Sequence, residues 1–185
     1  MNPSETKPWG IKSAKGIACW IQDRDAFLPL GAMTAHHIDS HDTFWWPSWG
    51  SKWRREQFSL QDVRLLTVMF MSMPGPYMMF VGGEEGLDDV LRGINALKQQ
   101  TPNWATLELV WLTDSHIPES VFGILRRSKD KEIMTLVNLG EATELELETR
   151  LSGSSIETVL EIGNQAATAV EGNKVQVSLG VKSAV

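Results

Sequence analysis

The spacing of apolar residues changes character near residue 102, and this change limits the folds open to the chain. Before it, helix-like and strand-like segments alternate, with glycine and proline between them. After it, short stretches with an apolar residue at every second position are separated by turn sequences, a pattern typical of antiparallel sheets. The sequence therefore predicts an α/β domain over residues 1–102 and an all-β domain over residues 103–185.

The first part is expected to contain three helices and two strands. Ser59 is suited to cap the second helix, and the apolar run Tyr77–Val81 is typical of a strand buried on both faces of a parallel sheet. The expected helices are 11–27, 60–72 and 87–97, and the expected strands are 32–40 and 77–81. Because two strands cannot bury three helices, we interpret this part as a piece of a larger sheet or barrel.

The second part is expected to form a small antiparallel β-sandwich. Thr143–Leu151 alternates cleanly, with leucines on one side and glutamates on the other. Six strands, each with one polar face, are sufficient for two packed sheets. The expected strands are 107–112, 121–127, 133–139, 144–151, 157–162 and 174–179.

Charge and hydropathy exclude several classes of partner. The formal net charge is −6 and the sequence pI is about 5.2, which argues against nucleic-acid binding. The longest apolar run, Leu65–Met73, is too short to cross a bilayer, and the polar residues 1–15 do not resemble a signal peptide. We expect a soluble protein without membrane or nucleic-acid partners, and a cytoplasmic location is favoured over export.

Histidine and aspartate cluster where the first expected strand ends. Residues 36–42 read His-His-Ile-Asp-Ser-His-Asp, and no hydrophobic core requires three imidazoles and two carboxylates together. On a regular strand His37, Asp39 and His41 share one face and could ligate a metal ion. Alternatively, His41 and Asp42 could hold sugar hydroxyls, since charge-assisted hydrogen bonds to a carboxylate are strong.

Tryptophans favour the sugar-binding alternative. Four of them fall within nine residues, directly after Asp42 and on an expected loop, and indole faces can stack on pyranose rings. We expect at least two of the four only to pack the loop. The glycine-rich turn at residues 82–86 would bring Glu84 or Glu85 to the same edge of the sheet, although it also fits the acidic start of the next helix. The tryptophans are Trp45, Trp46, Trp49 and Trp53.

Two of these segments resemble motifs of the α-amylase superfamily of glycoside hydrolases. Ser40-His41-Asp42 resembles the motif that ends the seventh barrel strand of that family, and residues 74–86 resemble its eighth-strand motif. Tyr77 and Gly83 depart from the second motif, where proline and aspartate are usual. Residues 121–139 resemble the paired strands of the family's C-terminal sandwich, so the resemblance covers roughly residues 30–180.

The resemblance implies the last part of a (β/α)8 barrel, with about two strands and their helices, followed by the sandwich. It implies retaining cleavage of α-glucosidic bonds, with Asp42 as the carboxylate that holds the substrate in the transition state and His41 beside it. Trp45, Trp46, Trp49 and Glu84 would line or support the sugar site. No cofactor and no metal ion is implied.

The family's nucleophile and acid/base residues lie on its fourth and fifth strands, about a hundred residues or more before the seventh-strand motif. Only 39 residues precede Ser40. Whether the chain is an enzyme is therefore open, and we expect it to be inactive without the missing N-terminal barrel portion. Two alternatives remain, a carbohydrate-binding module without turnover and a metal-dependent hydrolase that uses His37, Asp39 and His41.

Overall fold

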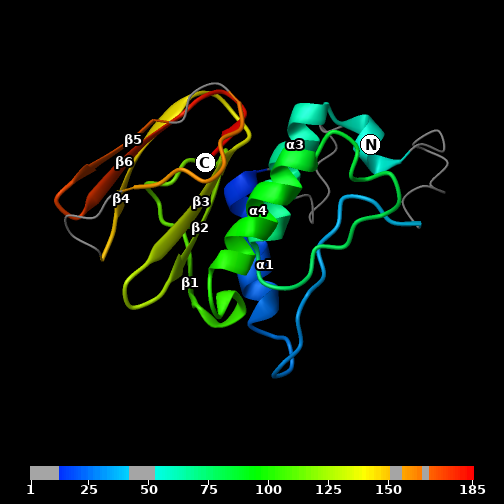
Figure 1. The fold of residues 1–185 in the computed structure, drawn as a ribbon, viewed down its shortest axis with the longest axis horizontal. Coiled ribbons are helices and arrows are strands. Elements are labelled where there is room, and N and C mark those ends of the chain that lie inside the picture. Colours follow the sequence, from blue (N-terminus) through cyan, green and yellow to red (C-terminus); the bar gives the residue numbers. More distant parts are fainter. Residues whose placement is uncertain (1–12, 42–52, 151–155, 164–166) are drawn as a thin grey trace.

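A computed structural model describes residues 13–41, 53–150, 156–163 and 167–185. Three helices, two antiparallel sheets and two short 3-10 turns make up this part of the chain (Figure 1). None of its helices has the length and apolar character of a transmembrane segment.

The helices begin where the sequence places suitable caps. In α1 (Ala14–Asp25) the Ser13 side chain accepts a hydrogen bond from the Gly16 backbone, and in α3 (Leu60–Ser72) Ser59 accepts one from Asp62. The third helix, α4 (Asp88–Gln100), has two aspartates in its first turn, where the helix dipole favours negative charge. The 3-10 turns are η2 (Arg54–Gln57) and η3 (Trp104–Thr106).

Two antiparallel sheets form the second part. The first has the order β1-β2-β3-β7 and the second the order β4-β6-β5. In β4 the leucines are buried and the glutamates exposed, as the alternation predicts. The strands are β1 (Glu108–Trp111), β2 (Val121–Arg127), β3 (Glu132–Asn138), β4 (Thr143–Glu148), β5 (Ala167–Glu171), β6 (Lys174–Leu179) and β7 (Ser183–Ala184).

The first sheet is covered on both faces. Phe122 and Val137 belong to a core shared with α1, α3 and α4, whereas Val121 and Leu136 belong to a second core shared with β4 and β6. Figure 1 shows the helices on one side of β2 and β3 and the second sheet on the other. Six of the seven residues of β2 are therefore buried. The expectation of one polar face per strand is wrong for β2.

The strand expected at 157–162 does not form as such. Only Ile162 makes a β-bridge, with Ala184. The place beside β3 is taken by β7, and β5 pairs with β6 across a Gly172-Asn173 turn. Neither β5 nor β7 was expected from the sequence.

The two strands expected in the first part are much shorter than predicted. They meet in a single parallel bridge between His36 and Tyr77, and no other strand of the described chain pairs with either segment. Val81, expected to be buried, is 85% exposed, and Met78 is 50% exposed. Because no described sheet neighbour covers them, Met78, Met79 and Val81 are left open to solvent.

Candidate functional site

The two motif-bearing segments lie side by side at the end of the helical layer. The backbone N–H of His36 donates to the Pro76 carbonyl at 2.9 Å, and that of Met78 donates to the His36 carbonyl at 2.8 Å. These bonds flank His36 in the slanted pattern of a parallel ladder. The segments that precede His41 and Glu84 are therefore held in parallel.

His36 is a structural residue. It is 5% exposed, its ring stacks on Phe70, and its Nε2 lies 2.8 Å from the Pro74 carbonyl oxygen. Because a carbonyl only accepts, Nε2 carries the proton. Burial lowers the pKa of the His36 imidazole, and the bond to Pro74 offsets this in part. A neutral His36 thus ties the Pro74-Gly75 turn to the neighbouring segment.

Gly75 is required by the same contact. Its φ is +96°, and a Cβ atom at this position would lie 2.1 Å from the Thr34 carbonyl oxygen. No side chain fits at that distance, so only glycine lets the two segments approach. The Pro-Gly pair of the second motif therefore has a packing role in this chain.

Asp39 and Arg55 form the main electrostatic contact of the site. Asp39 Oδ1 accepts the Arg55 backbone N–H at 2.9 Å, and Asp39 Oδ2 accepts Arg55 Nη1 at 2.6 Å. The exposed fraction is 4% for the Asp39 side chain and 19% for that of Arg55. Burial makes this pair a strong structural contact, since removing either partner would leave the other charge without compensation.

Arg55 also reaches the second segment. Its Nη2 lies 3.5 Å from the Val81 carbonyl oxygen, and its guanidinium carbon lies 5.1 Å from the centre of the Trp53 ring. The Trp53 ring in turn contacts Phe80, at 4.9 Å between ring centres. Trp53 therefore packs its own scaffold, as we expected of part of the tryptophan cluster.

Tyr77 connects the site to α3. Its hydroxyl lies 3.4 Å from Thr67 Oγ1, which itself donates to the Val63 carbonyl, so the Tyr77 hydroxyl is the donor of the pair. Burial raises the pKa of the Tyr77 phenol. The hydrogen bond with Thr67 offsets part of this rise, and the negative charge of Asp39 adds to it. A protonated phenol at this position keeps the parallel bridge anchored on α3.

Of the predicted sugar-binding residues, His41 and Glu84 belong to the described part of the chain. His41 is exposed, one residue after Ser40, and Glu84 is exposed in the turn before α4. Asp42, Trp45, Trp46 and Trp49 lie outside the described residues. The cleft at Asp39, Arg55 and Tyr77 measures about 10 Å³, room for a single water at most.

The geometry assumed for a metal site is wrong in one respect. Asp39 is buried and bonded to Arg55, whereas His37 and His41 are exposed, so the three do not share a face. The cause is a bend at Ile38, which breaks the alternation of a regular strand. No cluster of three or more metal-ligating side chains occurs among the described residues.

No periodic pattern in the sequence predicts the Asp39–Arg55 pair. Sixteen residues separate the two, too far for any periodic pattern to connect them. The one local signal is a carboxylate at the end of the buried segment that holds His36 and Ile38, because an arginine just before the next helix can reach that end.

Comparison with known proteins places the fold. No family model matches the sequence, and neither does any curated protein. Solved structures do match. They include an α-amylase from H. orenii, with a TM-score of 0.63, 11% identity and 94% of this chain aligned to 45% of that one.

Two further matches have the same character. A cyclomaltodextrin glucanotransferase aligns with a TM-score of 0.70 and 14% identity, over 93% of this chain and 39% of that one. A cyclic α-maltosyl-(1→6)-maltose hydrolase from Arthrobacter globiformis aligns with a TM-score of 0.63 and 17% identity, over 94% of this chain and 39% of that one. This chain spans less than half the length of these structures, and its fold is that of a part of an α-amylase-family enzyme.

Proposed function

We propose that the chain is the C-terminal part of a retaining glycoside hydrolase of the α-amylase type, acting on an α-glucan or oligosaccharide. The observation that carries this proposal is the parallel pairing of His36 with Tyr77. It joins the two segments whose motifs resemble consecutive barrel strands, within a fold that matches α-amylase-family structures over 93–94% of the chain.

In this proposal residues 1–102 are the end of a (β/α)8 barrel and residues 103–185 are the C-terminal β-sandwich. The change from helices with parallel segments to antiparallel sheets supports the division. The helical layer packs directly on β2 and β3, so the two parts share one core.

Asp42 and His41 are the residues assigned to the sugar. An ionised Asp42 would accept hydrogen bonds from two hydroxyls of one ring, and His41 would bind a neighbouring hydroxyl. Trp45, Trp46 and Trp49 would line the sugar site, with at most two of them stacking on sugar faces, and Glu84 would support the site from the adjacent turn. The bonds from Asp39 to Arg55 support this assignment because they join the two ends of the stretch that carries these residues.

The chain by itself is proposed to be inactive. Retaining hydrolysis needs two carboxylates about 5–5.5 Å apart, one as nucleophile and one as acid/base. The resemblance places both on strands that come before the segments seen here. The partner required for turnover is the N-terminal barrel portion, which would also cover the exposed Met78, Met79 and Val81.

Co-expression tests the proposal. The chain is produced together with the product of the coding sequence that precedes the Met1 codon, and reducing ends released from soluble starch are measured. We expect that sequence to encode one strand ending in the nucleophile Asp and one ending in the acid/base Glu. Turnover should appear only in the combined sample and should fall by more than about a hundredfold in Asp42→Asn.

Asp114→Asn is the matched control, because Asp114 is exposed in a loop of the second part. It should leave turnover unchanged. Equal activity of the Asp42→Asn and wild-type samples would contradict the proposed role of Asp42. Binding of maltoheptaose by the chain alone without turnover of any combination, seen as a change in tryptophan fluorescence, would instead identify a carbohydrate-binding module.

A further inference from the structure

A lysine occupies the inner face of α4, where the helix pattern favours an apolar residue. Val90, Ile94 and Lys98 follow one another at intervals of four residues, so they lie on one face of the helix. Val90 and Ile94 are buried, and Lys98 is partly buried. The amine of Lys98 therefore has less water around it than that of a surface lysine.

The Lys98 amine shares an aromatic ring with a second cation. Its Nζ lies 5.8 Å from the centre of the Trp104 ring, and the guanidinium carbon of Arg126 lies 4.6 Å from the same centre. Cation–π attraction extends to about 6 Å, so Arg126 is well within its range and Lys98 is at its limit. We call these three residues the Trp104 cluster.

Arg126 is the fixed cation of the Trp104 cluster. It is 4% exposed, and its guanidinium donates to the Ser72 carbonyl at 2.9 Å and to the Trp104 carbonyl at 3.3 Å. Ser72 is the last residue of α3, and the carbonyl end of a helix attracts a cation. Burial lowers the pKa of the Arg126 guanidinium, but from so high a value that it stays charged at neutral pH. Any charge that the cluster loses is therefore lost by Lys98.

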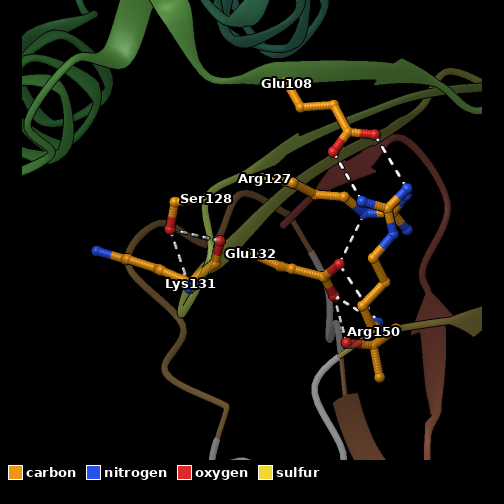
Figure 2. A network of polar contacts seen from close by, with 7 residues as sticks. Glu108, Arg127, Ser128, Lys131, Glu132 and Arg150 are labelled. Carbon is orange, nitrogen blue, oxygen red and sulfur yellow. Dashed lines mark hydrogen bonds and ion pairs between the residues drawn. The ribbon is translucent and has the colours of Figure 1, made fainter.

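No described carboxylate forms an ion pair with either cation of the cluster. The next residue of β2 has the opposite surroundings. Arg127 lies on the other face of the strand and donates to the Glu132 carboxylate at 2.6 Å (Figure 2). The Trp104 cluster is therefore a local region of positive charge, whereas the network around Glu132 is internally balanced.

Two effects act on the proton of Lys98 in the same direction. Burial lowers the pKa of its amine, and the nearby charge of Arg126 lowers it further. Both oppose the carbonyl end of α4, which favours a cation in the last helical turn. More of the amine is therefore uncharged at neutral pH than in an ordinary lysine. A lysine next to another cation is activated as a nucleophile in this way.

We propose that Lys98 is a site of acylation by acyl phosphates. The positive charge of the Trp104 cluster attracts the anionic donor. The amine nitrogen forms a bond to the acyl carbon, and the bond from that carbon to the phosphate oxygen breaks. Inorganic phosphate leaves with the electron pair, and the amine proton passes to water. The product is an uncharged amide.

Acylation would change the junction between the two parts of the chain. Trp104 lies in η3, between α4 and β1, and Arg126 connects η3 to the end of α3. An uncharged side chain at position 98 removes the repulsion from Arg126. Lys98→Gln, which mimics the amide, should therefore raise the melting temperature by at least about 1 °C, whereas Lys98→Arg should not raise it. A lower melting temperature in Lys98→Gln would contradict the repulsion on which the proposal rests.

The probe is acetyl phosphate, added to the full chain at about pH 7.5, with acetylation of each lysine followed by mass spectrometry. Lys98 should be acetylated at least about threefold faster than Lys129, an exposed lysine between β2 and β3. With N-acetoxysuccinimide, an uncharged donor, Lys98 should still react faster but by a smaller factor, because attraction of the anion no longer contributes. Equal rates for the two lysines with both donors, or a slower rate for Lys98, would overturn the proposal.

Arg126→Gln tests the source of the reactivity. Without the fixed charge, the ratio of the Lys98 rate to the Lys129 rate should fall at least about twofold. Arg92→Gln is the matched control, because Arg92 is exposed on the same helix, and it should leave the ratio unchanged. Thermal melts show whether both variants are folded. If Arg126→Gln is not, the wild-type chain decides. Its Lys98 rate should level off at a lower pH than its Lys129 rate, and identical pH profiles would overturn the proposal.

Discussion

The carboxylate of Asp39 binds both the backbone N–H and the guanidinium of Arg55, at 2.9 and 2.6 Å. The pair connects the end of the first parallel segment with η2, across the stretch that carries Asp42 and the tryptophan cluster. Arg55 also lies against Trp53 and reaches the Val81 carbonyl. One buried ion pair thus joins three segments that are distant in the sequence.

Arg55→Met should destabilise the fold by about 3–5 kcal/mol, because it leaves the Asp39 carboxylate buried without a partner. The free energy of unfolding from urea titrations measures this. Arg150→Met is the matched control, since Arg150 and Glu108 form an exposed pair whose loss should cost at most about 1 kcal/mol. Similar small losses in both variants would show that Asp39 is hydrated or protonated once Arg55 is removed.

Gly75→Ala should cost more than about 2 kcal/mol, since the new methyl group meets the Thr34 carbonyl and φ is strongly positive. Gly31 offers the control, because its φ is +83° but nothing lies within 4 Å of a Cβ atom there. Gly31→Ala should show only the backbone strain, about 1 kcal/mol. If calorimetric melts give equal shifts for the two, the segments do not pack as closely as described.

His36 should make stability dependent on pH near neutrality. Its pKa is lowered by burial in the folded chain, so below about pH 6.5 the unfolded chain binds more protons. Stability should therefore be full above that pH and fall as the pH drops to about 5.5. His36→Gln should be less stable than wild type at pH 8 but should lose less on acidification.

His116→Gln serves as the control for this pH series, because His116 is exposed. It should retain the wild-type slope of unfolding free energy against pH. A wild-type chain whose stability is constant between pH 8 and pH 5.5 would mean that His36 titrates normally and is accessible to water.

Elements governed by local signals could be predicted from the sequence. The bounds of α3, β2 and β6 agree with expectation. The Ser59 cap marks the start of α3, and turn sequences limit the two strands. β7 was missed because it has only two residues and forms only where Ser183 and Ala184 reach β3. Residues 157–162 have the strand pattern, but β7 lies between them and β3.

The candidate site was predicted in outline, and its contacts were not. The parallel approach of the two motif segments agrees with expectation, although it is limited to one residue pair. Asp39 was considered only as a metal ligand, because its partner Arg55 comes from a turn that no periodicity connects to it. The roles of His41, Asp42 and Glu84 stay predictions.

Hydrolysis of maltoheptaose by the purified chain alone is the most direct measurement of whether this chain is an incomplete glycosidase. Product release should not exceed that of the Asp42→Asn variant, since one substrate-holding carboxylate cannot replace a nucleophile and an acid. Clear turnover by the wild-type chain that disappears in Asp42→Asn would show instead that a complete catalytic site exists within these 185 residues.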